Sequence, residues 1–337
     1  MTAQNIIPQT TPLAKQIVAP LPGLALVAAL AAGAIWAKGQ FSIPLLGPMV
    51  IAMGLGVVLR NVFGALPWAA QGIFQAQRPL MRLGIVLLGL QLSLSQIIEA
   101  GAPLFLGIAA LLAASYSSTQ LFGRWLGVAP ELTRLIGAGT AVCGASAVMA
   151  VQGARPGSHN DLAYAIACVT LFGTLSMIGL PVLALALGLD GQGLGLWAGA
   201  AIHEVAQVVG ATESHSVEAA EWGMMAKLTR VLLLAPLVLV LTRFGGPSEA
   251  SDGPSPLPLF VLGFAAMMGL NSAVALPAEV LQPAATLTSF LLTMALAAMG
   301  LNTDLAALKR KGLRPLALGA IATLFVTAGA LALLLLI

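Results

Sequence analysis

The sequence predicts an all-α protein embedded in a membrane, in which about eleven apolar helices form a bundle. Three observations predict this fold class. Only 8% of the 337 residues are charged and 59% are hydrophobic, whereas about 25% of the residues of a soluble domain are charged. The mean hydropathy is +0.97. The apolar stretches are long and continuous, which favours membrane helices over the alternating strands of about ten residues that build a β-barrel.

Eleven apolar segments are each long enough to cross a bilayer, which takes about 20 residues. We number them spans 1 to 11, near residues 18–37, 41–60, 80–98, 103–123, 132–151, 161–187, 194–212, 222–243, 257–275, 284–303 and 315–336. The first segment is longer than the apolar core of a signal peptide and lacks a clear cleavage site, so we interpret it as a retained helix.

Lysine and arginine indicate the orientation, because loops on the cytoplasmic side carry more of them. The loops that follow even-numbered spans hold most of these residues: Arg60, Arg78, Arg82, Arg124, Arg134, Arg243, Lys309, Arg310, Lys311 and Arg314. Lys38 and Arg155 are the exceptions. We therefore expect a multi-pass protein of the bacterial inner membrane, with a cytoplasmic N-terminus and a periplasmic C-terminus.

Internal similarity suggests an inverted repeat. GLQLSLSQI (89–97) resembles GLNTDLAAL (300–308), and the seven spans between them make the two helices run in opposite directions, as in many secondary transporters. A weaker pair, 141–150 and 201–210, runs in parallel, which requires that one segment is re-entrant or that the similarity is accidental. We divide this single transporter domain into an extra helix at 1–40, a first repeat at 41–189 and a second repeat at 190–337.

Span 5 contains GTAVCGASAVMA (139–150), whose glycines make a poor helix interior. A break here would present the free N–H groups of a half-helix to an anion. Thr140, Cys143 and Ser146 recur every three residues and would share one face of a helix. With Gly144 they are our candidate substrate-binding residues. The alternative interpretation is a face of small residues that packs against a neighbouring helix.

Span 7 contains AIHEVAQVVGA (201–211), with two ionisable residues near its middle. An ionisable group there costs about 2.5–3.5 kcal/mol on insertion scales and therefore indicates a function. His203, Glu204 and Gln207 are close enough along a helix to point into one site. We assign His203 and Gln207 to substrate binding and Glu204 and Gln207 to a coupling ion. The alternative is a Glu–His pair that only fixes helix packing.

HEVAQ also resembles the zinc-protease motif H-E-x-x-H, but Gln207 replaces the second histidine and is a poor zinc ligand. We therefore expect no metal site, and an intramembrane metalloprotease is a weak alternative.

Five polar residues are weaker candidates. Lys227 and Arg230 in span 8 either extend to the membrane interface or attract an anion. Asn302 and Asp304 end span 10, where they cap a helix or line a transport path. Asn271 lies in span 9. The sequence shows no nucleotide-binding motif, so an ion gradient would drive transport.

Two of these stretches resemble blocks of a known family. GTAVCGASA is similar to the G-T-x-x-C-G-x-S-A block, and IHEVAQV to the I-H-E-x-x-Q-V block, of the YeiH-like bacterial membrane proteins, a family named for sulfate export. The resemblance covers nearly the whole chain.

More distantly, the chain resembles the bile acid, arsenite and riboflavin transporter superfamily. Its members have inverted five-helix repeats, a panel and a core domain, and two broken helices that cross beside substrate and sodium sites. The resemblance implies that residues 140–146 correspond to the first broken helix. It also implies that Glu204 and Gln207 are the acidic and amide residues of the second. The superfamily spaces those two as E-x-x-x-Q, whereas this chain has E-x-x-Q.

The sequence therefore predicts a secondary active transporter, and no enzyme, that moves a small anion such as sulfate, sulfite or an organosulfur anion by alternating access. A sodium- or proton-coupled symporter of an organic anion is the alternative, and a channel or a helical scaffold are weaker ones. Expected partners are the anion, the lipid bilayer and a second copy in a homodimer, without nucleic acid. No cofactor is expected beyond Na⁺ or H⁺ as the coupling ion, which Glu204 would hold.

Overall fold

The structure is a computed structural model that describes residues 19–41, 47–91, 94–243, 259–274 and 276–336. In these residues the secondary structure is entirely helical, which confirms the predicted all-α class. The first 18 residues of the predicted N-terminal segment lie outside the described part, as do two residues of the repeat GLQLSLSQI.

The described residues form the following helices in chain order. They are α2 (Leu21–Gln40), α3 (Pro48–Phe63), α4 (Ala70–Gln75), α5 (Met81–Leu88), α6 (Leu94–Trp125), α7 (Pro130–Ala141), α8 (Ala145–Ala154), α9 (His159–Ala186), α10 (Gly191–Ala201), α11 (Val205–Thr212), α12 (Val217–Leu232), α13 (Leu234–Arg243), α14 (Leu259–Ala273), α15 (Ala278–Leu301), α16 (Leu305–Arg310) and α17 (Leu313–Leu336). A π-helical turn, Ala76–Leu80, contains Pro79 and joins α4 to α5.

Six of the described helical stretches are long and apolar enough to cross a membrane. They are Leu21–Gln40, Gly101–Trp125, His159–Ala186, Val217–Leu241, Ala278–Leu301 and Leu313–Leu336. The predicted spans 5 and 7 are each split into two short helices instead, α7 with α8 and α10 with α11. A membrane protein with several spanning helices is thus supported, whereas eleven continuous spans are not confirmed.

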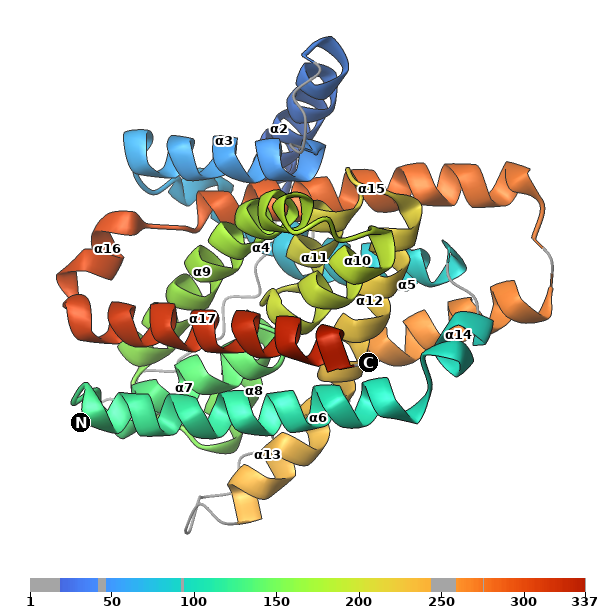
Figure 1. Cartoon of the computed structure of the whole chain (residues 1–337). Coiled ribbons are helices and arrows are strands. Elements are labelled where there is room, and N and C mark those ends of the chain that lie inside the picture. Colours follow the sequence, from blue (N-terminus) through green and yellow to red (C-terminus); the bar gives the residue numbers. More distant parts are fainter. Residues whose placement is uncertain (1–18, 42–46, 92–93, 244–258, 275, 337) are drawn as a thin grey trace, which may run out of the picture.

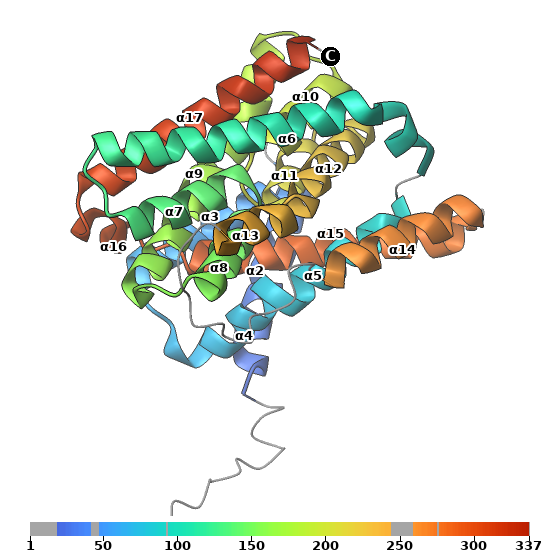
Figure 2. The same ribbon diagram turned by 90° about the horizontal axis from the view of Figure 1, so that it is seen from below.

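The helices pack as two groups. The first group consists of α2, α3, α4, α5, α14 and α15, in which α15 packs along α3 and α5. The second group consists of α6 to α13 and α17, in which α12 packs against α10 and α6 packs against α7 and α17. Figure 2 shows α6 and α17 on one side of the molecule and α4, α5 and α14 on the other. Because packing is denser within each group than between them, the boundary between the groups is where a cleft can open.

Small residues bring α3 and α15 into backbone contact. A Cβ atom built on Gly56 would lie 2.4 Å from the carbonyl oxygen of Ala297, and one on Gly300 would lie 2.3 Å from that of Met53. Such close approach is the usual way in which membrane helices associate, since lipid gives apolar side chains no reason to prefer protein. These two helices therefore form the rigid centre of the first group.

Ion pairs tie together one end of the bundle, which we call the α16 end. Arg60 at the end of α3 lies 3.2 Å from the carboxylate of Asp304, which precedes α16. Lys311, which follows α16, pairs with Asp161 in the first turn of α9. Figure 1 shows α16 at the edge of the molecule, with α17 and α6 running side by side away from it. α9 therefore begins at the α16 end and leads to the opposite end.

Candidate functional site

The stretch 139–150 does not form one helix. α7 ends at Ala141, Val142 to Gly144 form a turn, and α8 begins at Ala145, so the predicted break is confirmed. Gly144 has φ +61° and ψ −130°, a conformation that residues with a side chain rarely adopt. The low helix propensity of the glycines and this turn explain why the segment is interrupted.

α7 and α8 form a re-entrant hairpin, which enters the bundle and returns to the same end. A Cβ atom built on Gly157, just after α8, would lie 3.1 Å from the carboxylate of Glu131 in the first turn of α7. One on Gly139 would lie 2.8 Å from Val148, so the two legs also touch deeper in the bundle. We call 130–154 the first hairpin and the turn 142–144 its tip.

α10 and α11 form a second hairpin, 191–212, whose tip is 202–204. Its ends also lie together, because a Cβ atom on Gly191 would lie 2.7 Å from the hydroxyl of Ser216, just beyond α11. Side-chain caps lie at this end of the hairpin: Asp190 caps α10 by accepting from the N–H of Gly193 at 2.7 Å, and Ser216 caps the following helix, α12, by accepting from that of Ala219 at 3.0 Å. Since α9 connects the hairpins, the second enters from the end opposite the first.

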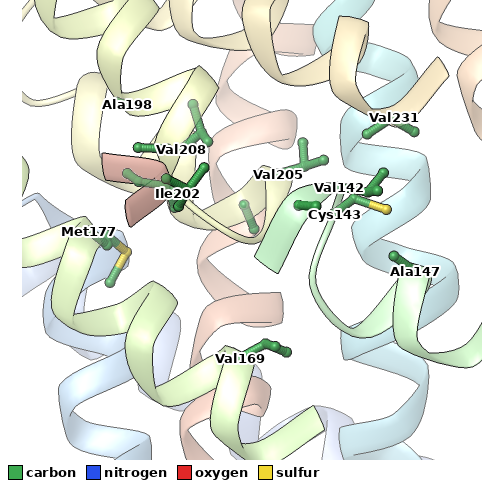
Figure 3. Close-up of a cluster of buried hydrophobic side chains, with 14 of the residues drawn as sticks. Val142, Cys143, Ala147, Val169, Met177, Ala198, Ile202, Val205, Val208 and Val231 are labelled. Atoms are coloured by element: carbon green, nitrogen blue, oxygen red, sulfur yellow. The ribbon is translucent and has the colours of Figure 1, made fainter. Parts of the chain in front are cut away.

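The two tips meet inside the protein. The backbone N–H of Ala145, the first residue of α8, donates to Oε1 of Glu204 at 2.5 Å. A Cβ atom on Gly144 would lie 2.1 Å from the same oxygen, so glycine is needed here for close approach as well as for its backbone angles. Figure 3 shows the apolar surroundings, with Val142 and Ile202 from the two tips in one buried cluster. Unwound backbone survives in a membrane only when protein encloses it, as it does here.

His203, Glu204 and Gln207 do not point into one site, because each contacts a different helix. Glu204 contacts the first hairpin, as described. Gln207 donates through Nε2 to the carbonyl of Thr170 on α9 at 3.2 Å, and its Oε1 accepts from the N–H of Glu204 at 3.2 Å. Nε2 of His203 lies 3.4 Å from the hydroxyl of Thr323 on α17. The structure thus places Glu204 alone at the junction, and the other two hold the second hairpin in position.

Thr140, Cys143 and Ser146 do not share a face, because the break separates them. Thr140 lies on α7 and is buried, and Cys143 is a buried free thiol in the tip. Ser146 lies in the first turn of α8 and is half-buried. The prediction of one polar helix face was wrong because it assumed a continuous helix, whereas Gly144 and Ser146 do lie beside the Glu204 carboxylate.

Lys227 and Arg230 on α12 are buried, at 0% and 1% exposure, so the interpretation that they extend to the membrane interface is wrong. Lys227 donates to the carbonyl oxygens of Val142 at 2.8 Å and Ile202 at 2.7 Å. Arg230 donates to Ala141 at 3.1 Å and Ile202 at 2.9 Å, and also to Thr140. Both cations therefore bind both hairpins.

The remaining candidates lie away from the tips. Asp304 accepts from the N–H of Ala307 at 2.9 Å, which confirms the helix-cap interpretation, and it pairs with Arg60. Asn302 donates to Gln77 at 2.8 Å. Asn271 is half-buried on α14.

A cleft opens beside Glu204, at the boundary between the two helix groups. Its empty volume is about 470 Å³, part of which is open to solvent. The second group contributes Ala145, Ser146, Met149, Ile166 and Glu204, and the first group contributes Gln77, Arg78, Met81, Arg82 and Met299. The cleft thus combines the N-terminus of α8, one carboxylate and two arginines.

The sequence analysis used Arg78 and Arg82 only to determine orientation and missed their place in this cleft. Their spacing of four residues was the available signal, because it places both on one helix face. Nη2 of Arg78 lies 2.7 Å from the sulfur of Met149 across the cleft, and its guanidinium lies 4.7 Å from the ring centre of Phe74. Arg78 is therefore held toward α8, whereas the guanidinium of Arg82 lies 5.9 Å from the ring centre of Phe260 on α14.

Comparisons with known proteins agree with this picture of a membrane protein. A UPF0324 membrane protein of Corynebacterium glutamicum is 38% identical over 289 residues, covering 85% of this chain and 84% of that protein. Another from Pseudomonas aeruginosa is 36% identical over 333 residues, covering 93% and 92%. A third from Agrobacterium fabrum is 34% identical over 299 residues, covering 87% and 86%.

These names mention neither sulfate export nor the bile acid, arsenite and riboflavin superfamily, so both of those resemblances stay predictions. The family model described as conserved hypothetical protein 698 matches residues 22–319. By this match and by its relatives, the chain belongs to the conserved hypothetical protein 698 family of UPF0324 membrane proteins.

Proposed function

We propose that the protein is a secondary active transporter that moves a small anion across the bacterial inner membrane by alternating access, with Glu204 as the coupling group. One observation carries this proposal. Two hairpins from opposite ends meet at the Glu204 carboxylate, beside a cleft that carries Arg78 and Arg82. Broken helices whose ends face a central site are a recurring design of secondary transporters.

The charge of the site supports an anion as the substrate. Among the buried side chains of the described residues, Lys227 and Arg230 are cationic and Glu204 is the acid, so positive charge is in excess. Arg78 and Arg82 add to this excess at the cleft. The first N–H groups of α8 have no partner inside the helix, so hydrogen bonds and the helix dipole favour negative charge there.

Glu204 can couple anion binding to an ion gradient because its carboxylate already occupies the start of α8. An incoming anion competes with this carboxylate for the N–H of Ala145. A proton on Glu204 weakens its hold on that N–H and removes a negative charge from the cleft. The proton and the anion then bind together more favourably than either does alone, which is the requirement for symport.

The two helix groups offer a route to alternating access. The cleft residues come from both groups, and packing between the groups is sparser than packing within them. Motion of the second group, which carries both hairpins, against the first would change the end at which the cleft opens. Rocking of one bundle against another around a fixed site is the usual form of this mechanism.

The first hairpin also supports the expected orientation of the protein in the membrane. Because the first hairpin returns to the α16 end, Arg155 lies at that end together with Arg60, Arg124 and Lys311. Arg155 is therefore no longer an exception to the positive-inside rule, and Lys38 remains one. By the positive-inside rule the α16 end is cytoplasmic, with the N-terminus inside and the C-terminus outside.

The test is a binding screen followed by transport. Purified protein is heated with sulfate, sulfite, thiosulfate, taurine or small carboxylates, and we expect at least one anion to raise the melting temperature, since a ligand of the folded state stabilises it. The same anion should accumulate in proteoliposomes under an ion gradient and show saturation. Currents that pass without saturation would favour a channel, and the absence of any anion effect would count against the proposal.

A further inference from the structure

The two cations on α12 occupy an unusual position. Buried lysine and arginine side chains normally pair with carboxylates, because an isolated charge is costly to bury. Lys227 instead donates to the backbone carbonyls of Val142 and Ile202, at 2.8 and 2.7 Å. Arg230 donates to four carbonyls, those of Thr140, Ala141, Gly199 and Ile202. Both side chains therefore bridge the C-terminal ends of α7 and α10, one from each hairpin.

Such carbonyls are the kind of ligand that holds sodium in other transporters. The last carbonyls of a helix have no partner inside the helix, and the helix dipole makes that end negative. Unwound carbonyls and the C-terminal ends of half-helices coordinate sodium ions where helices are broken in a membrane. In this protein the ammonium and guanidinium groups satisfy the carbonyls of residues 140–142 and 202.

We propose that Lys227 and Arg230 are built-in replacements for coupling sodium ions, so that anion transport by this protein is independent of sodium and driven by protons through Glu204. This inference rests on the proposed function and names its coupling ion. A bound sodium would join the two tips only while it is present. Covalently attached cations join them permanently, which leaves Glu204 as the group at the junction that can exchange an ion.

The surroundings of Glu204 are consistent with this division of roles. Among the described residues, the charged or titratable groups that interact with Glu204 or line its cleft are Cys143 from the first tip, Lys227 from α12, and Arg78 and Arg82 from the first helix group. Sodium would need several oxygen ligands at this place. Arg78 and Arg82, which line the same cleft, repel a sodium ion.

The first experiment measures anion binding and uptake by the wild-type protein in sodium, potassium and N-methylglucamine buffers of equal ionic strength. We expect equal affinity and equal uptake in all three, and uptake that rises with an inward proton gradient. Uptake that requires sodium would overturn the inference while leaving the anion-transporter proposal intact. Loss of anion binding in every buffer would instead refute the underlying function.

The second experiment removes the ammonium group that binds the carbonyl oxygens of Val142 and Ile202, which we call the carbonyl cage. Lys227→Ala removes the ammonium group and leaves space, whereas Lys227→Met removes the charge and fills the space. We expect both variants to melt several degrees lower, because the carbonyls of Val142 and Ile202 lose their donor. Sodium or ethylammonium should restore the Ala variant and not the Met variant. Lys311→Ala, a change at the α16 end, serves as the control and should respond to neither cation.

Two outcomes of this experiment would contradict the inference. An Ala variant that stays as stable as the wild type would show that the cage needs no cation. Stabilisation of the wild type by sodium to the same extent as the Ala variant would show that sodium binds elsewhere. If the Ala variant does not fold, the ion dependence of the wild type still decides the matter.

Discussion

The two hairpins have the same shape and opposite chemistry. Each is a pair of short helices whose ends lie together and whose tip reaches the centre. The first tip carries no charged side chain and offers the N–H of Ala145, which Gly144 makes accessible. The second tip carries the carboxylate of Glu204, which accepts from it. Neither tip makes this contact alone, because the donor lies on one hairpin and the acid on the other.

The hairpins also differ in what holds them. The second is anchored by side chains, through Gln207 to α9, His203 beside α17 and a capped start at Asp190. The first is anchored by its small residues and by the cations of α12. The first hairpin is therefore held mainly by groups of its neighbours, whereas the second is held partly by its own polar side chains.

The largest effect should follow from removing the acid of the second tip. Glu204→Gln keeps the size of the side chain and cannot exchange a proton, so we expect proton-driven uptake to fall to the level of empty liposomes. Anion binding should persist and lose its pH dependence, because the neutral amide competes less for the N–H of Ala145. Calorimetric titration at several pH values measures this. Glu213→Gln, an exposed change next to the second hairpin, should keep wild-type behaviour.

Wild-type uptake by the Glu204→Gln variant would show that the acid is structural and that the chemical difference between the hairpins has no role in coupling.

A smaller but still large effect should follow from changing the first tip. Gly144→Ala would force a side chain into a backbone conformation that costs about 1–3 kcal/mol. Its Cβ would also collide with the Glu204 carboxylate, at 2.1 Å. We expect a lower melting temperature and loss of anion binding. Gly179→Ala on α9, where a Cβ meets nothing within 4 Å, is the matched control and should not destabilise the protein. Equal melting temperatures of both variants would contradict the tip geometry.

The sequence predicted the break between α7 and α8 because glycine acts locally, on the chain segment that contains it. Glu204 was likewise predicted from the sequence, because an ionisable side chain in the middle of an apolar segment is costly to insert into a membrane. The residues that these groups contact in the folded protein could not be predicted in the same way. That α7 turns back instead of crossing depends on packing between Glu131 and Gly157, 26 positions apart in the sequence. The role of Lys227 depends on carbonyl groups, which every residue has and no sequence pattern marks.

The cleft was missed for a related reason. Arg78 and Arg82 follow the pattern of topological charges, and the positive-inside rule explained them without a site. Their place in the cleft follows the π-helical turn Ala76–Leu80, which contains Pro79 and is not marked by the charge pattern. Because the positive-inside rule already accounted for Arg78 and Arg82, the sequence analysis did not consider them as residues of a site.

An intermediate effect should follow from weakening the cleft. Arg82→Gln removes one cation from the wall opposite the first tip, and a hydrogen bond to a charged group contributes about 1.5–3 kcal/mol. We therefore expect the anion affinity to fall about tenfold or more, with little change in melting temperature without anion. Arg124→Gln, at the exposed end of α6, is the control for a general loss of positive charge. A similar loss in both variants would indicate long-range attraction instead of binding in the cleft.

The smallest effect concerns the entrances of the hairpins, where the two differ by one cap. The N-cap of α10 is Asp190, whose carboxylate accepts from the N–H of Gly193, whereas the N-cap of α7 is Ala129, which has no side chain able to accept. Replacing a cap by alanine costs about 1 kcal/mol, so Asp190→Ala should lower the melting temperature by a few degrees. Ala129→Asp supplies the missing cap, with an acid at the positive end of the helix, and should raise the melting temperature by a similar amount.

The double variant then exchanges the two entrances and should melt near the wild type, since the sites are distant and their effects add. If Ala129→Asp instead lowers the melting temperature or slows uptake, the bare entrance of the first hairpin is needed for its movement, and the difference between the hairpins extends from their tips to their ends.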